Sequence, residues 1–179
     1  AVKPTDFKGL TPRLLVKEGD KVLAGSPVLA DKKNPEILVT SPVSGTVSEV
    51  VRGEKRKLLE VKIKADGQQE YVDFGTHKAS DMSADEVKEL LLKSGLWAGL
   101  VQRPYGIVAD PSAEPKAIFV SAFSTAPLAA SPEFALKDDF NNVQAAVNAL
   151  GKLTKGGVHV SLSIDNFSGS PFHKLENVI

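Results

Sequence analysis

The amino-terminal part of the chain is organised around the segment Leu15-Val16-Lys17-Glu18-Gly19-Asp20-Lys21-Val22. Its central part, residues 16–21, returns 34 positions later as Val50-Val51-Arg52-Gly53-Glu54-Lys55. We expect Gly19 and Gly53 each to adopt a positive φ at a turn, because glycine reaches that region without steric cost. Two similar halves indicate a β structure with approximate twofold symmetry. The alternative is chance similarity within a segment rich in valine, glycine and lysine.

Short strands joined by turns are predicted on both sides of this repeat. Residues 1 to about 75 show no helical period longer than one turn. Apolar runs at 28–30 and 37–39 flank the polar tip Asp31-Lys32-Lys33-Asn34-Pro35. This pattern predicts a hairpin with Asn34-Pro35 in the turn and two exposed lysines. A second turn, at residues 41–45, precedes another valine-rich strand.

The pattern changes near Ser80 to capped helices that alternate with apolar runs, which is typical of an α/β region. We therefore predict two domains, residues 1–76 and 77–179. Ser83 and Glu86 have the spacing of a capping box, and Gly95 has the position of a helix C-cap. These signals predict a helix of about three turns between them.

The remaining pattern predicts a strand, a helix and a second strand. Residues 116–123 are expected to form a strand in which Ile118, Phe119 and Val120 are buried on both faces, as in a parallel sheet. Ser131-Pro132 is a predicted helix start. A longer helix is expected to begin at Asp138-Asp139 and to stop at Gly151, and residues 158–163 form the next strand. The apolar face of this helix comprises Phe140, Val143, Val147 and Leu150. Together these elements make a βαβ unit.

Composition excludes several classes of function. The chain of 179 residues has 22 Lys and Arg against 22 Asp and Glu, so no net field favours nucleic acid. It contains no cysteine, which excludes disulfides, thiolate zinc sites, iron–sulfur ligation and cysteine nucleophiles within it. The longest charge-free stretch, residues 117–132, is too short to span a bilayer as a helix. The chain begins without Met, and we expect it to be a fragment.

Candidate ligand-binding residues are few. Ser121, Ser124 and Thr125 follow a predicted parallel strand, where open α/β sheets bind ligands, although turn formation explains their hydroxyls more simply. The loop between Phe123 and Ser131 has no glycine, which disfavours a dinucleotide. Lys32 and Lys33 occupy the position of an acylated lysine in carrier domains, and a solvated turn is the alternative.

Other polar motifs point to contacts rather than to chemistry. Arg103 and Tyr105 follow Trp97 near a predicted turn and have the composition of an interface anchor, whereas a buried Trp97 beside a solvated Arg103 is the other reading. The three histidines are far apart in sequence, so neither a metal site nor a catalytic residue is assigned. The sequon at residues 166–168 is interpreted as accidental.

Residues 15–22, with Gly25-Ser26-Pro27-Val28-Leu29 and Ser41-Pro42-Val43-Ser44-Gly45-Thr46-Val47, resemble the biotinyl/lipoyl-like barrel-sandwich family. Four further motifs resemble the NqrA family, which supplies one subunit of the bacterial sodium-translocating NADH:quinone reductase. They are Asp31-Lys32-Lys33-Asn34-Pro35, Arg52-Gly53-Glu54-Lys55-Arg56, Arg103-Pro104-Tyr105, and residues 118–121 through 127–129. The resemblance covers most of residues 7–165, and residues 168–179 are assigned no role.

This resemblance implies a barrel-sandwich hybrid followed by a partial Rossmann-like α/β domain. It implies a peripheral subunit on the cytoplasmic face of the bacterial inner membrane, docked on integral membrane subunits. The whole complex oxidises NADH, reduces ubiquinone and translocates sodium, and other subunits hold its flavins and iron–sulfur cluster. We therefore expect a docking scaffold, and a contributor to quinone binding, with no catalytic centre or cofactor of its own. A lipoyl- or biotin-type carrier, or a soluble α/β enzyme with its catalytic groups elsewhere, are the alternatives.

Overall fold

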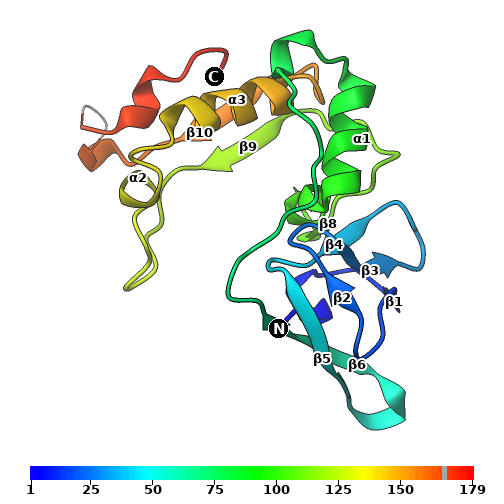
Figure 1. The fold of residues 1–179 in the computed structure, drawn as a ribbon. Coiled ribbons are helices and arrows are strands. Elements are labelled where there is room, and N and C mark those ends of the chain that lie inside the picture. Colours follow the sequence, from blue (N-terminus) through cyan, green and yellow to red (C-terminus); the bar gives the residue numbers. More distant parts are fainter. Residues whose placement is uncertain (167–168) are drawn as a thin grey trace. The chain divides into compact units, whose positions relative to one another are not determined.

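A computed structural model describes residues 1–166 and 169–179 (Figure 1). The sequon at 166–168 therefore lies partly outside the described residues. The chain divides into two compact units. The first unit comprises residues 1–75 and 88–113, and the second comprises residues 76–87 and 114–179. No helix in the described part of the chain is both long and apolar enough to span a membrane.

The first unit contains two three-stranded antiparallel sheets. One sheet has the order β1-β3-β4, with β1 at Pro12–Leu14, β3 at Pro27–Asp31 and β4 at Leu38–Thr40. The other has the order β2-β5-β6, with β2 at Lys21–Val22, β5 at Gly45–Arg52 and β6 at Leu58–Ala65. Two small packed sheets confirm the predicted β module.

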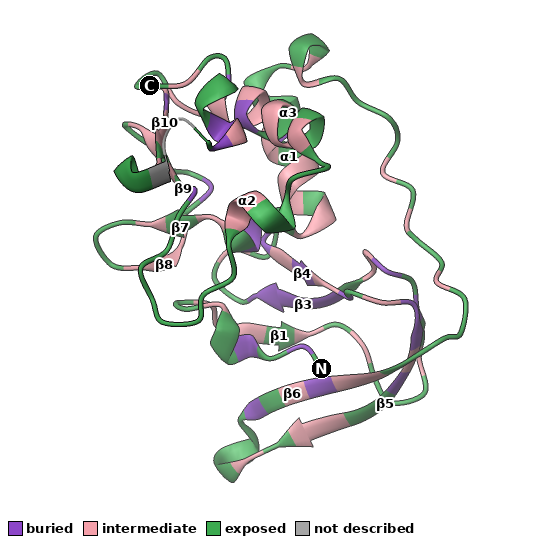
Figure 2. Cartoon of the chain, turned by 90° about the vertical axis from the view of Figure 1, so that its left-hand side faces the viewer, coloured by how far each residue is buried: buried purple, intermediate pink, exposed green. Residues whose placement is uncertain are grey.

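Aliphatic side chains from both sheets form the core of the first unit. β3 is buried at every position after Pro27, and Figure 2 shows this strand in the buried colour. Val28 and Leu29 are fully buried, as are Val47 on β5 and Val61 on β6. Each such side chain contributes about 1.5–3 kcal/mol relative to leaving it exposed.

The two halves of the sequence repeat adopt different backbone conformations. Gly19 has φ +89° as predicted, and its turn is tied to β5 because its N–H donates to the Val47 carbonyl at 2.8 Å. The prediction for Gly53 is wrong, since its φ is −96° and the positive values fall on Lys55 and Arg56. Gly53 remains extended because its N–H pairs with the Lys57 carbonyl across the hairpin, which moves the turn two residues along.

The predicted hairpin at residues 28–39 is confirmed by the antiparallel pairing of β3 with β4. Its turn closes where the Ile37 N–H donates to the Asn34 carbonyl at 3.0 Å. Asp31 is buried beneath this turn, and its carboxylate accepts the N–H groups of Thr11 and Asn34 at 2.8 and 3.1 Å.

The capping box predicted a helix, and α1 spans Ala84–Ser94. The Ser83 N–H donates to the Glu86 carboxylate at 2.7 Å, and the Glu86 N–H donates to the Ser83 hydroxyl at 3.3 Å. Gly95 follows with φ +80°. A 3-10 turn at Leu96–Gly99 and the short hairpin of β7 (Val101–Gln102) and β8 (Ile107–Val108) complete this region.

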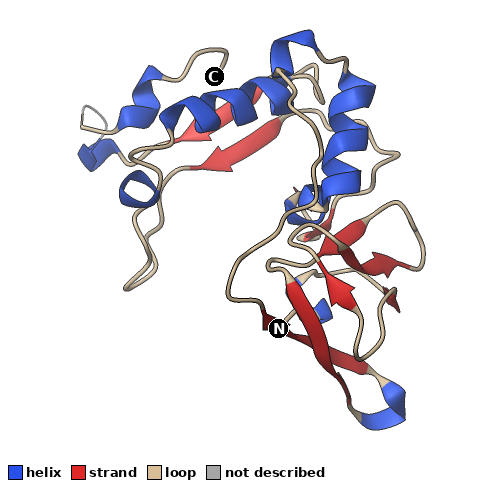
Figure 3. Cartoon of the chain, in the orientation of Figure 1, coloured by secondary structure: helices blue, strands red, loops and turns tan. Residues whose placement is uncertain are grey.

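The second unit is the predicted βαβ arrangement. β9 (Ile118–Ser121) pairs in parallel with β10 (Val158–Ser161), and α3 (Phe140–Gly151) connects them and packs on one face (Figure 3). A short helix, α2 (Pro132–Ala135), precedes α3, and the Ser131 hydroxyl accepts the Phe134 N–H as its cap. The predicted apolar face of α3 is confirmed, since Phe140, Val143, Val147 and Leu150 all belong to the core.

The prediction that β9 is buried on both faces is wrong. Phe119 is 74% exposed and stacks on His159 with ring centroids 4.9 Å apart, whereas Ile118 and Val120 face the core. Burial therefore alternates along β9, because α3 covers one face of this sheet. The strand is also shorter than the predicted residues 116–123.

Residues 169–179, to which the sequence analysis assigned no role, complete the core of the second unit. Phe172 and Leu175 are buried in it, the former in a 3-10 turn at Pro171–Lys174. The Ile179 N–H donates to the Val158 carbonyl at 2.9 Å, and the Val160 N–H donates to the Ile179 carbonyl at 3.2 Å. This end of the chain thus lies along β10.

The close approach of β5 and β6 supplies a test of the first unit. A Cβ on Gly45 would lie 2.1 Å from the Lys64 carbonyl oxygen, while a Cβ on Gly67 would meet open space. We expect Gly45→Ala to lower the free energy of unfolding by about 1–3 kcal/mol or more. Gly67→Ala should stay within about 0.5 kcal/mol of the parent. Urea unfolding followed by the fluorescence of Trp97, the single tryptophan, measures both; equal stability of the two variants would contradict the assigned register.

Candidate functional site

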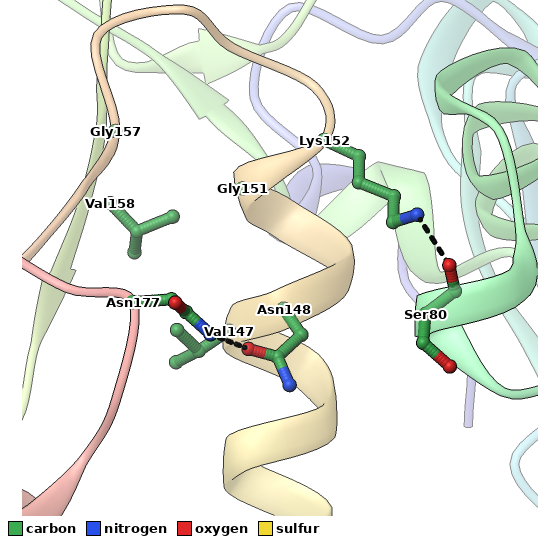
Figure 4. Close-up of a pocket in the computed structure, with 8 residues that line it drawn as sticks. All are labelled: Ser80, Val147, Asn148, Gly151, Lys152, Gly157, Val158 and Asn177. Carbon is green, nitrogen blue, oxygen red and sulfur yellow. Dashed lines mark hydrogen bonds between the residues drawn. The ribbon is translucent and has the colours of Figure 1, made fainter.

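A cavity of about 390 Å³ lies in the second unit at the carboxyl end of α3 (Figure 4). Its walls come from α3, from the start of β10, from the chain near its carboxyl end and from Ser80. The lining residues are Ser80, Val147, Asn148, Gly151, Lys152, Gly157, Val158 and Asn177.

Lys152 is the charged group of this cavity. Its ammonium donates to the Ser80 carbonyl at 3.2 Å and to the Met82 carbonyl, which ties the segment before α1 to the end of α3. A cation at a helix carboxyl end also interacts favourably with the helix dipole. Across the cavity, the Asn177 amide donates to the Asn148 side-chain oxygen at 3.1 Å. The lining offers hydrogen bonds and one ammonium, without a thiol, imidazole or carboxylate.

The sequence analysis did not find these cavity residues. A lysine after a helix-ending glycine is a common helix-end signal, and nothing in its local pattern shows that it reaches residues 80 and 82. Asn148 and Asn177 lie 29 positions apart and meet only through the packing of the carboxyl-terminal segment on α3.

The three hydroxyl residues after β9 are exposed. The Ser121 hydroxyl donates to the Phe123 carbonyl at 2.8 Å, and the Ser124 hydroxyl accepts the Ala126 N–H at 3.3 Å. Both bonds support the simpler interpretation, turn formation, and a ligand contact by Ser121, Ser124 or Thr125 stays a prediction. The glycine-free loop does not fit a dinucleotide pyrophosphate, which needs close approach of backbone amides.

Lys32 and Lys33 are exposed on the β3–β4 hairpin, as predicted. The Lys32 N–H donates to the Thr11 carbonyl at 2.8 Å, so the backbone beneath the side chain is held in place. Acylation of either lysine is not tested by this geometry.

The structure separates Trp97 from the proposed anchor. Trp97 is only 6% exposed, and its indole N–H donates to the Ala109 carbonyl at 2.9 Å. Arg103 and Tyr105 instead lie at the tip between β7 and β8, where Tyr105 is 71% exposed. The Gly106 N–H closes this tip on the Gln102 carbonyl at 2.9 Å. Arg103 and Tyr105 are thus available to a partner, while Trp97 supports them from the core.

Metal-ligating side chains do not gather in the described residues, where no three His, Cys, Asp or Glu side chains are placed to hold an ion. His159 lies against Phe119, and its ring nitrogen Nε2 is 3.3 Å from the Gly156 carbonyl oxygen.

Family models match the chain in two consecutive parts. Residues 1–66 match the NqrA N-terminal barrel-sandwich hybrid domain, and residues 82–179 match the NqrA second alpha/beta domain. The chain belongs to the NqrA family. Both matches agree with the two kinds of structure described above, and the second includes the carboxyl-terminal residues that the sequence analysis left aside.

Curated relatives are NqrA subunits of Na(+)-translocating NADH-quinone reductases. The protein from Pseudomonas aeruginosa strain PAO1 is 41% identical over 152 residues, which is 84% of this chain and 34% of the relative. One from Yersinia pestis is 38% identical over 157 residues, 87% of this chain and 35% of the relative. One from Histophilus somni is 36% identical over 163 residues, 90% and 36% respectively. The chain spans about a third of the length of these NqrA relatives.

The predicted boundary between residues 76 and 77 falls in the interval that neither NqrA domain model covers. It therefore stays a prediction.

The capping box beside the cavity gives a pH-dependent test. Hydrogen bonds from Ser83 hold the pKa of the Glu86 carboxyl below its ordinary 4.5, and the nearby cations His77 and Lys152 add to this effect. The contribution of Glu86 to stability is therefore full above pH 4.5 and is lost as the pH falls through the lowered pKa.

We expect Glu86→Ala to lower the melting temperature at neutral pH, and the difference from the parent to shrink as the pH falls below 4.5. Thermal unfolding followed by circular dichroism at a series of pH values measures this. Ser83→Ala keeps the backbone donor and should retain most of the pH dependence. A constant difference between parent and Glu86→Ala across the series would rule out this account.

Proposed function

We propose that this chain is the amino-terminal part of the NqrA subunit of a sodium-translocating NADH:quinone reductase. The observation that carries the proposal is the order of the two family matches, a barrel-sandwich hybrid followed by the second NqrA domain. Relatives at 36–41% identity that carry the name of this reductase add support. In this role the chain serves a complex that oxidises NADH, reduces ubiquinone and translocates sodium ions.

Within that complex, the chain acts as a docking scaffold. The argument rests on residue types, since the chain has no cysteine and the cavity in the second unit is lined by amides, one ammonium and apolar groups. These groups bind and orient, and a redox reaction needs flavins and an iron–sulfur cluster, which we assign to other subunits. The partners are integral membrane subunits, and the chain is peripheral on the cytoplasmic face of the inner membrane.

The β7–β8 tip is the proposed contact. Arg103 and Tyr105 are of the residue types that dominate binding energy at protein interfaces. Their base is firm, because the buried Trp97 is hydrogen-bonded to Ala109 directly after β8. A rigid base lowers the entropy that the tip loses on docking.

The hydroxyls after β9 are the proposed place of any quinone contact in this chain. Ser121, Ser124 and Thr125 are exposed at the carboxyl end of a parallel strand, which is where open α/β sheets bind ligands.

Covalent carriage on Lys32 or Lys33 is the competing function, and it differs in one measurable property. A lipoyl or biotinyl group adds a discrete increment to the intact mass of protein from its native source. We expect the unmodified mass, and the increment on either lysine would replace the scaffold by the carrier.

Replacement of Arg103 tests the docking contact in the full-length protein. We expect Arg103→Ala to reduce the yield of assembled complex, and NADH:quinone activity with it, by about tenfold or more if the side chain is a dominant contact. Arg13→Ala, an exposed arginine on β1, is the matched control and should assemble normally. Unchanged assembly and activity in Arg103→Ala would remove this residue from the interface.

A further inference from the structure

The hairpin of β5 and β6 ends in a cluster of basic side chains, Arg52, Lys55, Arg56 and Lys57, here called the basic tip (Figure 1). All four residues are exposed. Both strands have eight residues, whereas β2 pairs with β5 only at Thr46 and Gly45, near the other end of the hairpin. The basic tip therefore lies beyond the three-stranded part of its sheet.

Charge is concentrated on this tip although the whole chain is neutral. Residues 52–57 carry four cations against one carboxylate, that of Glu54, a local net charge of +3. The next carboxylates along the hairpin, Glu49 and Glu60, pair with Lys62 at 2.8 and 3.6 Å. Glu18 accepts the Val50 N–H at 2.8 Å on the tip side of these pairs. The positive potential at the basic tip is thus opposed chiefly by Glu54.

The backbone holds these cations in a defined arrangement. Lys55 and Arg56 have φ +53° and +61°, a region that side-chain-bearing residues rarely adopt. The Gly53 N–H donates to the Lys57 carbonyl at 2.8 Å, and the Arg52 guanidinium donates to the Arg56 carbonyl at 3.2 Å. Backbone strain of this kind persists where the surrounding structure imposes it, and it is concentrated at functional sites.

We propose that the basic tip binds the phosphate groups of anionic phospholipids at a membrane surface. Clusters of Lys and Arg are attracted to anionic headgroups without any apolar insertion. A protein interface usually has an apolar or aromatic centre, and single-stranded nucleic acid is bound by stacking on aromatic rings. The basic tip contains neither, since its nearest large apolar side chain with notable exposure is Leu59, 39% exposed on β6. The choice of a membrane rests in part on the proposed function, which places the chain beside one.

Sedimentation with lipid vesicles tests the proposal directly. The folded chain is mixed with vesicles of phosphatidylcholine containing phosphatidylglycerol, or of phosphatidylcholine alone, at low salt and at about 0.15 M salt. We expect binding to the anionic vesicles only, weakened by salt. Each cation near an anionic surface is worth about fivefold in binding. The variant Arg52→Gln/Lys55→Gln/Arg56→Gln/Lys57→Gln should therefore bind about tenfold or more weakly.

Two further variants make the outcome decisive. Lys55→Gln/Lys57→Gln leaves the Arg52–Arg56 hydrogen bond in place, so it keeps the hairpin intact and should lose about half of the effect on a logarithmic scale. Lys8→Gln/Lys32→Gln/Lys33→Gln/Lys93→Gln removes the same number of exposed cations elsewhere and should bind like the parent.

Equal binding by the parent and the two tip variants would overturn the proposal, as would equal loss in the control variant. Parent protein that ignores anionic vesicles but binds RNA or an acidic peptide would also overturn it. Because vesicle binding needs no other protein of the complex, its failure leaves the assembly test of Arg103 unaffected, and the two proposals can fail separately.

Discussion

Valine and leucine side chains that meet between two small sheets hold the first unit together. The strands are short, so few hydrogen bonds join any one pair, and burial of the side chains of β3, β5 and β6 has to supply most of the stability. This constraint explains why the loops between strands are tied down so often. The Gly19 turn is bonded to β5, and the buried Asp31 caps its own hairpin with two hydrogen bonds.

The second unit solves the same problem with a helix. α3 covers one face of the β9–β10 pair, and the carboxyl-terminal segment adds Phe172 and Leu175 to the apolar layer. The opposite face presents Phe119 and His159 as a stacked pair. Strand burial on a single face is the physical result, and it gives β9 an alternating pattern in space that its run of three apolar residues does not show in sequence.

Function in this chain resides on its exposed tips rather than in a reactive centre. The β3–β4, β5–β6 and β7–β8 turns each present charged or aromatic side chains on a backbone that is closed by hydrogen bonds. A scaffold needs this arrangement, because a rigid tip loses little entropy when it meets its partner. The hydroxyls after β9, by contrast, are engaged in local turns.

Local signals in the sequence determined much of the structure. The Ser83–Glu86 capping box, the Ser131 cap, the apolar face of α3 and the Asn34-Pro35 turn all depend on residues within a few positions of one another, so reading the chain was enough to place them. The family resemblance was carried by motifs of the same kind. Tertiary structure alone decided the rest. Whether Gly53 or Lys55 takes the positive φ depends on cross-strand pairing, and whether Phe119 is covered depends on which face α3 packs against. The contact between Lys152 and the carbonyl groups of residues 80 and 82 joins segments about 70 positions apart. No local pattern encodes such contacts, because they arise only when distant segments share one core.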